Sequence, residues 1–211
     1  MALFAHQQRA RDRYRYESRI PLFFDAGTGK TLTSLTIARD KYEAGEIGAL
    51  LVIAPNGVHK QWATEEIPKW YKDVDTTVQW RKNKKLFFVE GKFNIVCTNI
   101  EQFSTKTKYL EYVNWVNAHK TMIILDEATR IKNPKAVRTQ RLLYEFNDIV
   151  KRGKTIITSM PKTVARAILT GTPVTTVSAN TGLSAAGEFT GKAGYTEAPS
   201  NNGVAVAALA H

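Results

Sequence analysis

This sequence is poor in cysteine, and Cys97 is its single example among 211 residues. One cysteine excludes an internal disulfide and favours a reducing, intracellular and cytoplasmic setting. No run of about 18 apolar residues occurs, so neither a transmembrane helix nor a membrane partner is expected. The few histidines are scattered without metal-ligand spacing, so no zinc site is predicted.

Acidic residues are outnumbered by basic ones, 19 to 30, which leaves a net charge of +11. The basic residues are concentrated in three segments, 9–19, 81–85 and 130–141. A charge of this size predicts a polyanionic partner such as nucleic acid. The alternative is that the charge serves solubility alone.

The length and a hydrophobic content of 43% predict one globular domain with its own core. Short apolar runs alternate with segments of helical spacing. The predicted strands are 20–24, 49–53, 86–89, 94–97, 122–125 and 165–169, and the predicted helices are 5–18, 32–43, 62–70, 107–118 and 136–150. This alternation is typical of an α/β fold with a mostly parallel sheet covered on both faces. We expect the domain to span 1–176, with a low-complexity Ala/Gly/Ser-rich tail at 177–211 that is poorly ordered or loosely packed.

A glycine-rich segment, Gly27-Thr28-Gly29-Lys30-Thr31, lies between a predicted strand and a predicted helix. Glycines allow the backbone to wrap around phosphates, and the helix N-terminus adds oriented N–H donors. In such a loop the lysine reaches the β- and γ-phosphates and the threonine hydroxyl binds Mg²⁺. The sequence therefore predicts a phosphate-binding loop of the G-x-G-K-T form, and the alternative is a chance match in a turn.

Two acidic residues, Asp126 and Glu127, directly follow the apolar run 122–125. Magnesium prefers hard oxygen ligands, which suits Asp126. Glu127, one residue further, is placed to polarise an attacking water. Such a pair is often only a solvated turn, but the upstream phosphate loop favours a shared catalytic site.

Together these segments resemble the motifs of the N-terminal lobe of superfamily 2 helicases, closest to the Snf2-like branch. The segments that resemble motifs I, Ia, Ib, II and III are 24–31, 51–55, 95–99, 126–134 and 169–173. They follow the family's order across roughly residues 3–175. The resemblance implies a three-layer RecA-like P-loop NTPase domain that binds ATP and Mg²⁺. It also implies DNA-dependent ATP hydrolysis, with DNA preferred over RNA as the partner.

The resemblance carries over roles for matching residues. Lys30, Asp126 and Glu127 would be catalytic, and Thr31 and Asp126 would hold Mg²⁺. Gln7 would recognise adenine, beside the loop residues Gly27, Thr28, Gly29, Lys30 and Thr31. Pro55, Asn56, Thr98 and Asn99 would lie near the nucleic-acid backbone, and Thr170 and Thr172 would couple phosphate state to lobe movement. For Pro55 and Asn56 the alternative is a simple strand-ending turn.

Three features depart from the family pattern. Thr129 stands where many relatives have histidine, and Phe24 fills a position that is usually small. No second-lobe motif is visible after 175, so we expect a second RecA-like lobe in trans and weak or no activity from this lobe alone. The alternative is a non-catalytic module that binds nucleic acid or a partner; a small-molecule P-loop kinase fits poorly. A phage-encoded protein in a bacterial host is also expected from the resemblance.

The tryptophans receive structural interpretations. We expect Trp62, Trp70 and Trp115 to be packing anchors. Trp80 lies beside basic residues, so it is either a surface-to-core anchor or a base-stacking platform. Cys97, within a predicted strand, is expected in the core.

Overall fold

A six-stranded parallel sheet forms the centre of the computed structural model, which describes residues 3–80, 85–131, 133, 136–142, 149–151, 154–156 and 163–171. In spatial order its strands are β1 (Arg19–Phe23), β8 (Thr163–Thr170), β5 (Thr121–Asp126), β2 (Ala49–Ala54), β4 (Phe93–Asn99) and β3 (Thr76–Gln79). Every pair of neighbours in this sheet is parallel. The predicted α/β fold with a parallel sheet is confirmed. The predicted tail, 177–211, lies outside the described residues.

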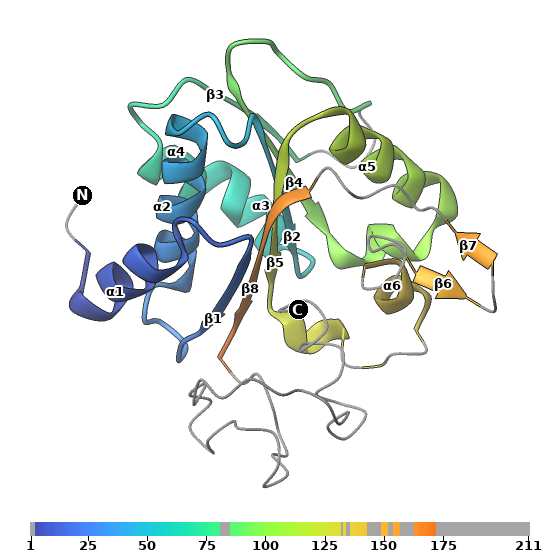
Figure 1. Cartoon of the computed structure of the whole chain (residues 1–211), viewed down its shortest axis with the longest axis horizontal. Helices are drawn as coiled ribbons and strands as arrows, with labels where there is room; N and C mark the ends of the chain where they lie inside the picture. Colours follow the sequence, from blue (N-terminus) through green and yellow to red (C-terminus); the bar gives the residue numbers. More distant parts are fainter. Residues whose placement is uncertain are drawn as a thin grey trace, which may run out of the picture.

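Helices cover both faces of the sheet (Figure 1). One face carries α1 (Ala5–Tyr14), α2 (Lys30–Glu43), α3 (Val58–Gln61), the π-helical η1 (Trp62–Glu66) and α4 (Ile67–Trp70). The other face carries the 3-10 helix η2 (Ile100–Ser104), α5 (Lys106–Ala118), the 3-10 helix η3 (Ala128–Ile131) and α6 (Val137–Gln140). Among the described residues, no helix has the length and apolar character needed to cross a bilayer.

The core consists of two layers of side chains, one on each side of the sheet. All six residues of β2 are buried, and they alternate between the layers. Leu51 and Ile53 pack in the layer below α5, whereas Leu50 and Val52 pack in the layer below α2. This two-sided burial explains why the strands are continuously apolar and do not alternate with polar residues.

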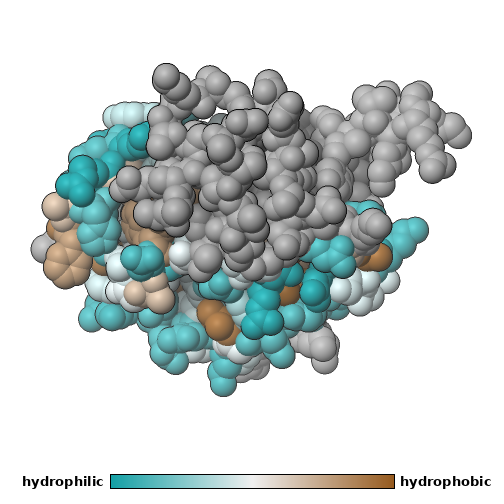
Figure 2. Space-filling model, turned by 90° about the horizontal axis from the view of Figure 1, so that it is seen from below, coloured by the Kyte–Doolittle hydropathy of each residue, from teal (hydrophilic) through white to brown (hydrophobic). Residues whose placement is uncertain are grey.

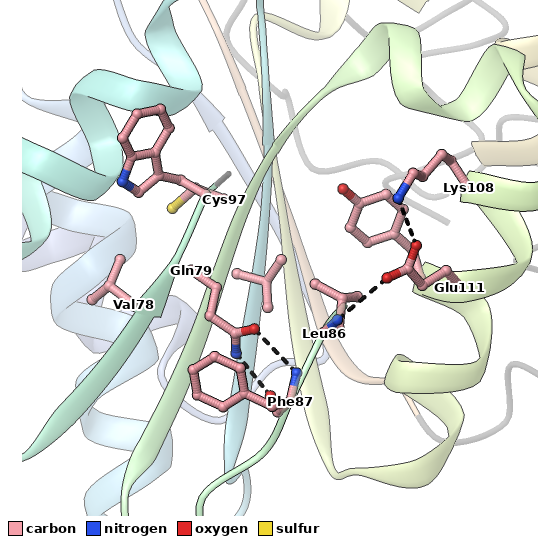
Figure 3. A pocket seen from close by; sticks show the side chains of 10 residues that line it. Val78, Gln79, Leu86, Phe87, Cys97, Lys108 and Glu111 are labelled. Atoms are coloured by element: carbon pink, nitrogen blue, oxygen red, sulfur yellow. Dashed lines mark hydrogen bonds and ion pairs between the residues drawn. The ribbon is translucent and has the colours of Figure 1, made fainter. Parts of the chain in front are cut away.

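The prediction of a strand at 86–89 is wrong. Instead, the strand at this edge of the sheet is β3, and hydrogen bonds from side chains hold the later segment (Figure 3). The amide of Gln79 donates to Phe87 O at 2.7 Å and accepts from Phe87 N at 3.1 Å. The amide of Asn94 makes the same pair of bonds to Val89 N and O, at 2.8 and 2.9 Å. The two side-chain amides thus bind the backbone N–H and C=O groups that would otherwise pair with a neighbouring strand. The apolar segment therefore stays irregular.

The prediction of one helix over 136–150 is also wrong at its end, where residues 149 and 150 belong to a strand. Helix α6 ends at Gln140, and residues 143–148 lie outside the described part. Further on, β6 (Ile149–Lys151) pairs in antiparallel fashion with β7 (Lys154–Ile156). The β-branched pair at positions 149 and 150 favours a strand, although its spacing also fits a helix. The first helix is likewise shorter than predicted, because α1 ends at Tyr14.

Candidate functional site

Three strands end at the same edge of the sheet and bring distant segments together. Phe23 of β1 is in register with Thr170 of β8, and Leu169 of β8 is in register with Asp126 of β5. The glycine-rich loop follows β1 directly, so it lies at the same edge of the sheet as the acidic residues that follow β5, with the end of β8 between them. A Cβ atom added at Gly171 would lie 3.6 Å from Phe24 O and 3.8 Å from Lys30 Nζ. The motif after β8 therefore contacts the loop, as parallel strands predict.

The glycine-rich loop requires its glycines. Gly27 has φ of +78° and Gly29 has φ of +87°, in the left-handed region that disfavours side chains. A side chain at Gly29 would also collide with the amide of Gln7. Helix α2 begins immediately afterwards at Lys30. Its N-cap residue, Gly29, offers no side-chain cap, and the N–H groups of a first helical turn favour an anionic group beside them.

The side chain of Lys30 folds back over the loop. Its ammonium group donates to Phe24 O at 2.8 Å and to Asp25 O at 2.9 Å. Thr28 closes the other side of the loop, because its hydroxyl donates to Asp25 O at 2.7 Å. The positive charge of Lys30 thus lies within the curve of the loop. A bound phosphate could accept the hydrogen bonds that Lys30 Nζ now donates to the two carbonyl oxygens.

Gln7 is buried against this loop, with 2% of its surface exposed. Its Oε1 accepts from Phe4 N at 2.9 Å, and its Nε2 donates to Thr28 O at 3.1 Å. The ring of His6 lies 2.9 Å from the same Thr28 oxygen. Gln7 therefore braces the phosphate loop in this structure, and its recognition of adenine stays a prediction.

Asp126, at the end of β5, is half-buried and is held by a tryptophan. Its Oδ2 accepts from the indole Nε1 of Trp62 at 2.8 Å. Burial raises the pKa of Asp126 above its usual value; the Trp62 hydrogen bond and the Lys30 charge oppose this shift, while the Glu127 charge adds to it. A cation beside this carboxylate would be favoured, because it would offset the cost of burying the negative charge.

Glu127 has φ of 55°, and among the described residues it is the only one other than glycine with positive φ. Its Oε1 accepts from the hydroxyl of Thr129 at 2.8 Å. A positive φ is costly for a residue with a side chain, so the turn after β5 holds Glu127 in a sparsely populated backbone conformation. Thr129, which stands at the histidine position of many relatives, thus fixes the orientation of Glu127 here.

The four residues predicted near nucleic acid separate into two groups. Asn56 is exposed and Pro55 is half-buried, in the loop that follows β2. Thr98, in contrast, is 2% exposed and donates its hydroxyl to Tyr112 Oη at 2.7 Å. Asn99 is also buried, and its Oδ1 accepts from Gln102 N at 3.2 Å to cap η2. The side chains of Thr98 and Asn99 thus make hydrogen bonds inside the domain, and their position near the nucleic-acid backbone stays a prediction.

Of the two predicted coupling residues, Thr170 belongs to β8. Thr170 is fully buried at the end of β8, next to the loop contact made by Gly171. Thr172 lies outside the described residues. Their coupling role stays a prediction.

The hydrogen bond between Trp62 and Asp126 was not anticipated from the sequence, which predicted Trp62 only as a packing anchor. It is such an anchor, since 1% of its surface is exposed. However, an indole has one donor and no acceptor, so a buried tryptophan normally requires a nearby acceptor. That rule could have indicated from the sequence that Trp62 has a hydrogen-bond acceptor, although it does not identify Asp126 as that acceptor.

Trp80 is half-buried and packs on the core, with Lys60 Nζ 5.5 Å from the centre of its ring.

The end of the sheet that holds these groups faces the viewer in Figure 2. The described residues visible on this face are mainly hydrophilic, with small separate hydrophobic spots. Arg130, which follows the acidic pair, is exposed.

Sequence comparison agrees with the motifs. The sequence profile of the SNF2-related domain matches residues 13–181. The ISWI chromatin-remodeling complex ATPase ISW1 of Saccharomyces cerevisiae is 31% identical over 144 residues, covering 65% of this chain and 12% of ISW1. Chromodomain-helicase-DNA-binding protein 8 of Xenopus tropicalis is 27% identical over 154 residues, covering 65% of this chain and 6% of that protein. The chain thus spans a small part of these relatives.

The fold is similar to solved structures. The SWI2/SNF2 ATPase core of Sulfolobus solfataricus in complex with dsDNA matches with a TM-score of 0.60 and 24% identity, over 82% of this chain and 32% of that one. A second structure, of the Sulfolobus solfataricus SWI2/SNF2 ATPase core domain, gives a TM-score of 0.57 and 25% identity over the same shares. These comparisons do not test a phage origin, which stays a prediction. Because the family profile covers most of the sequence and the fold agrees with it, the chain belongs to the SNF2-related domain family.

Proposed function

We propose that this chain is the first ATP-binding lobe of a Snf2-like superfamily 2 translocase, which hydrolyses ATP in a DNA-dependent manner when a second RecA-like lobe completes it. The observation that carries the proposal is the convergence of Lys30, Asp126 and Glu127 at one sheet edge. The family's sequence match supports nucleotide binding. The names of the relatives, a chromatin-remodeling ATPase and a DNA-binding helicase, support DNA as the partner.

The described residues fit ATP with Mg²⁺. The positive φ of Gly27 and Gly29 opens a backbone cradle that a Cβ would strain, and Lys30 supplies a positive charge within it. The Thr31 hydroxyl and the Asp126 carboxylate are hard oxygen donors of the kind that Mg²⁺ prefers. Mg²⁺, when bound, neutralises charge on the phosphate oxygens.

Glu127 would accept a proton from the attacking water, with Thr129 holding its carboxylate in place. An arginine finger from the second lobe would stabilise the charge of the transition state, a contribution of about 10³ to 10⁵ in rate. The lobe alone is therefore expected to bind ATP well and to hydrolyse it slowly.

The test is ATP hydrolysis by the purified chain, with and without double-stranded DNA, beside a Lys30→Ala variant. We expect slow turnover that rises with DNA in the parent chain and is lost in the variant. ATP binding is measured in parallel. Binding without turnover would indicate a half-site that needs its second lobe. The absence of binding would overturn the proposal and favour a non-catalytic binding module.

DNA binding is expected to be independent of sequence and strongly dependent on salt. The exposed Asn56 loop and the basic surface residues would contact phosphates, which releases counterions. A lobe that neutralises about four phosphates should lose roughly 150-fold in affinity when salt rises fourfold. Fluorescence anisotropy with two unrelated duplexes would measure this. A difference between the duplexes larger than the salt effect would contradict backbone recognition.

A further inference from the structure

We infer that Trp62 is a positioning residue for magnesium binding, because its indole N–H fixes the carboxylate of Asp126. This inference rests on the proposed function, since it assigns a role within the same site. The bond joins residues 64 positions apart, at 2.8 Å, across the edge of the sheet. Trp62 itself is not assigned a contact with ATP or Mg²⁺, and it acts only through Asp126.

An indole is well suited to hold a metal-binding carboxylate. It donates one hydrogen bond and has no acceptor, so it cannot compete for the cation. It carries no charge, unlike a lysine or arginine, and therefore does not repel Mg²⁺. The indole occupies Oδ2 of Asp126, and a carboxylate has a second oxygen that can face a cation. Replacement of a group that holds a metal ligand in this way typically costs about 10- to 100-fold in metal affinity.

The indole is rigidly held. Trp62 packs in the same buried layer as β2 and α2, including Leu35 and Val52. A side chain fixed by packing can hold its partner in one geometry, whereas an exposed donor would lose rotamer freedom on binding. Trp62 also belongs to the helical segment α3–η1, which starts directly after the Asn56 loop. The residue thus links the proposed nucleic-acid loop to the proposed metal ligand.

The chain offers a matched control. Trp70 also donates its indole N–H to a carboxylate, Glu66 Oε2, at 2.9 Å. This second bond lies within one helical segment and away from the strand ends. Trp62→Phe and Trp70→Phe therefore remove the same type of hydrogen bond, one at the site and one outside it.

The experiment measures binding of a fluorescent ATP analogue at increasing Mg²⁺ concentration. We expect Trp62→Phe to raise the Mg²⁺ concentration for half-maximal effect by about 10- to 100-fold. Binding of the analogue in the presence of EDTA should not change, and Trp70→Phe should match the parent chain throughout. An unchanged Mg²⁺ requirement in Trp62→Phe would overturn the inference. Failure of the parent chain to bind the analogue at all would instead overturn the proposed function.

A second measurement uses the parent chain, so it does not depend on whether the Trp62→Phe variant folds. The chain has four tryptophans, so its indole N–H resonances in ¹⁵N NMR spectra can be assigned by exclusion with Phe variants of the other three. In the ATP-bound parent chain, addition of Mg²⁺ should shift the Trp62 indole resonance and leave that of Trp70 in place. No shift at Trp62 would contradict the inference even if Trp62→Phe failed to fold.

Discussion

Replacement of Glu127 by Gln is expected to lower ATP turnover by about 10²- to 10⁴-fold, the usual contribution of a general base. ATP affinity should stay within about twofold, because Glu127 is assigned no contact with the phosphates. The substituted amide would keep the size of the side chain and an oxygen that can accept from Thr129, as Glu127 Oε1 does at 2.8 Å. Single-turnover hydrolysis with DNA present and equilibrium ATP binding would measure the two effects separately.

The control for this variant is Glu66→Gln, since Glu66 also accepts a hydrogen bond from a neighbouring side chain but lies away from the strand ends. Its turnover should equal that of the parent chain. If Glu127→Gln hydrolysed ATP at the parent rate, another group would activate the water. The positive φ of Glu127 would then serve only the turn after β5.

The parts of the site that were predictable are those with local signals. The glycine-rich loop and the acidic pair each follow an apolar run, and parallel strands bring such positions to one edge. The structure agrees with this expectation, because Phe23 is in register with Thr170 and Leu169 is in register with Asp126. The order of the strands in the sheet was not predictable, because β1 pairs with β8 from the far end of the described chain.

One error arose where side chains replace backbone contacts. The apolar segment 86–89 looks like a strand, yet the amides of Gln79 and Asn94 take its hydrogen bonds. The hydrogen bond between Thr98 and the hydroxyl of Tyr112 was likewise not predictable, and the position of Thr98 near nucleic acid stays a prediction. Such pairings join residues 5 to 14 positions apart and depend on side-chain direction, which periodicity does not contain.

The largest effect on stability is expected from Phe93→Ala. Phe93 begins β4, is completely buried, and stacks on Tyr42 of α2 with 4.4 Å between ring centres. It also lies 5.8 Å from the ring of Tyr71, whose hydroxyl donates to Leu35 O at 2.6 Å. The ring therefore joins the sheet to α2 and to the segment after α4. Removal of a buried phenylalanine costs about 3 to 5 kcal/mol in the free energy of unfolding.

For a chain of this size, that loss corresponds to a fall in Tm of about 6 to 20 °C. Thermal unfolding followed by circular dichroism would measure it, with Phe4→Ala as the control, since Phe4 is 73% exposed. At a temperature where Phe93→Ala is still folded, ATP affinity should equal that of the parent chain. Phe93 packs near the C-terminal end of α2, whereas the phosphate loop lies at its N-terminal end. A variant that kept its Tm but lost ATP affinity would show instead that this aromatic cluster shapes the phosphate site.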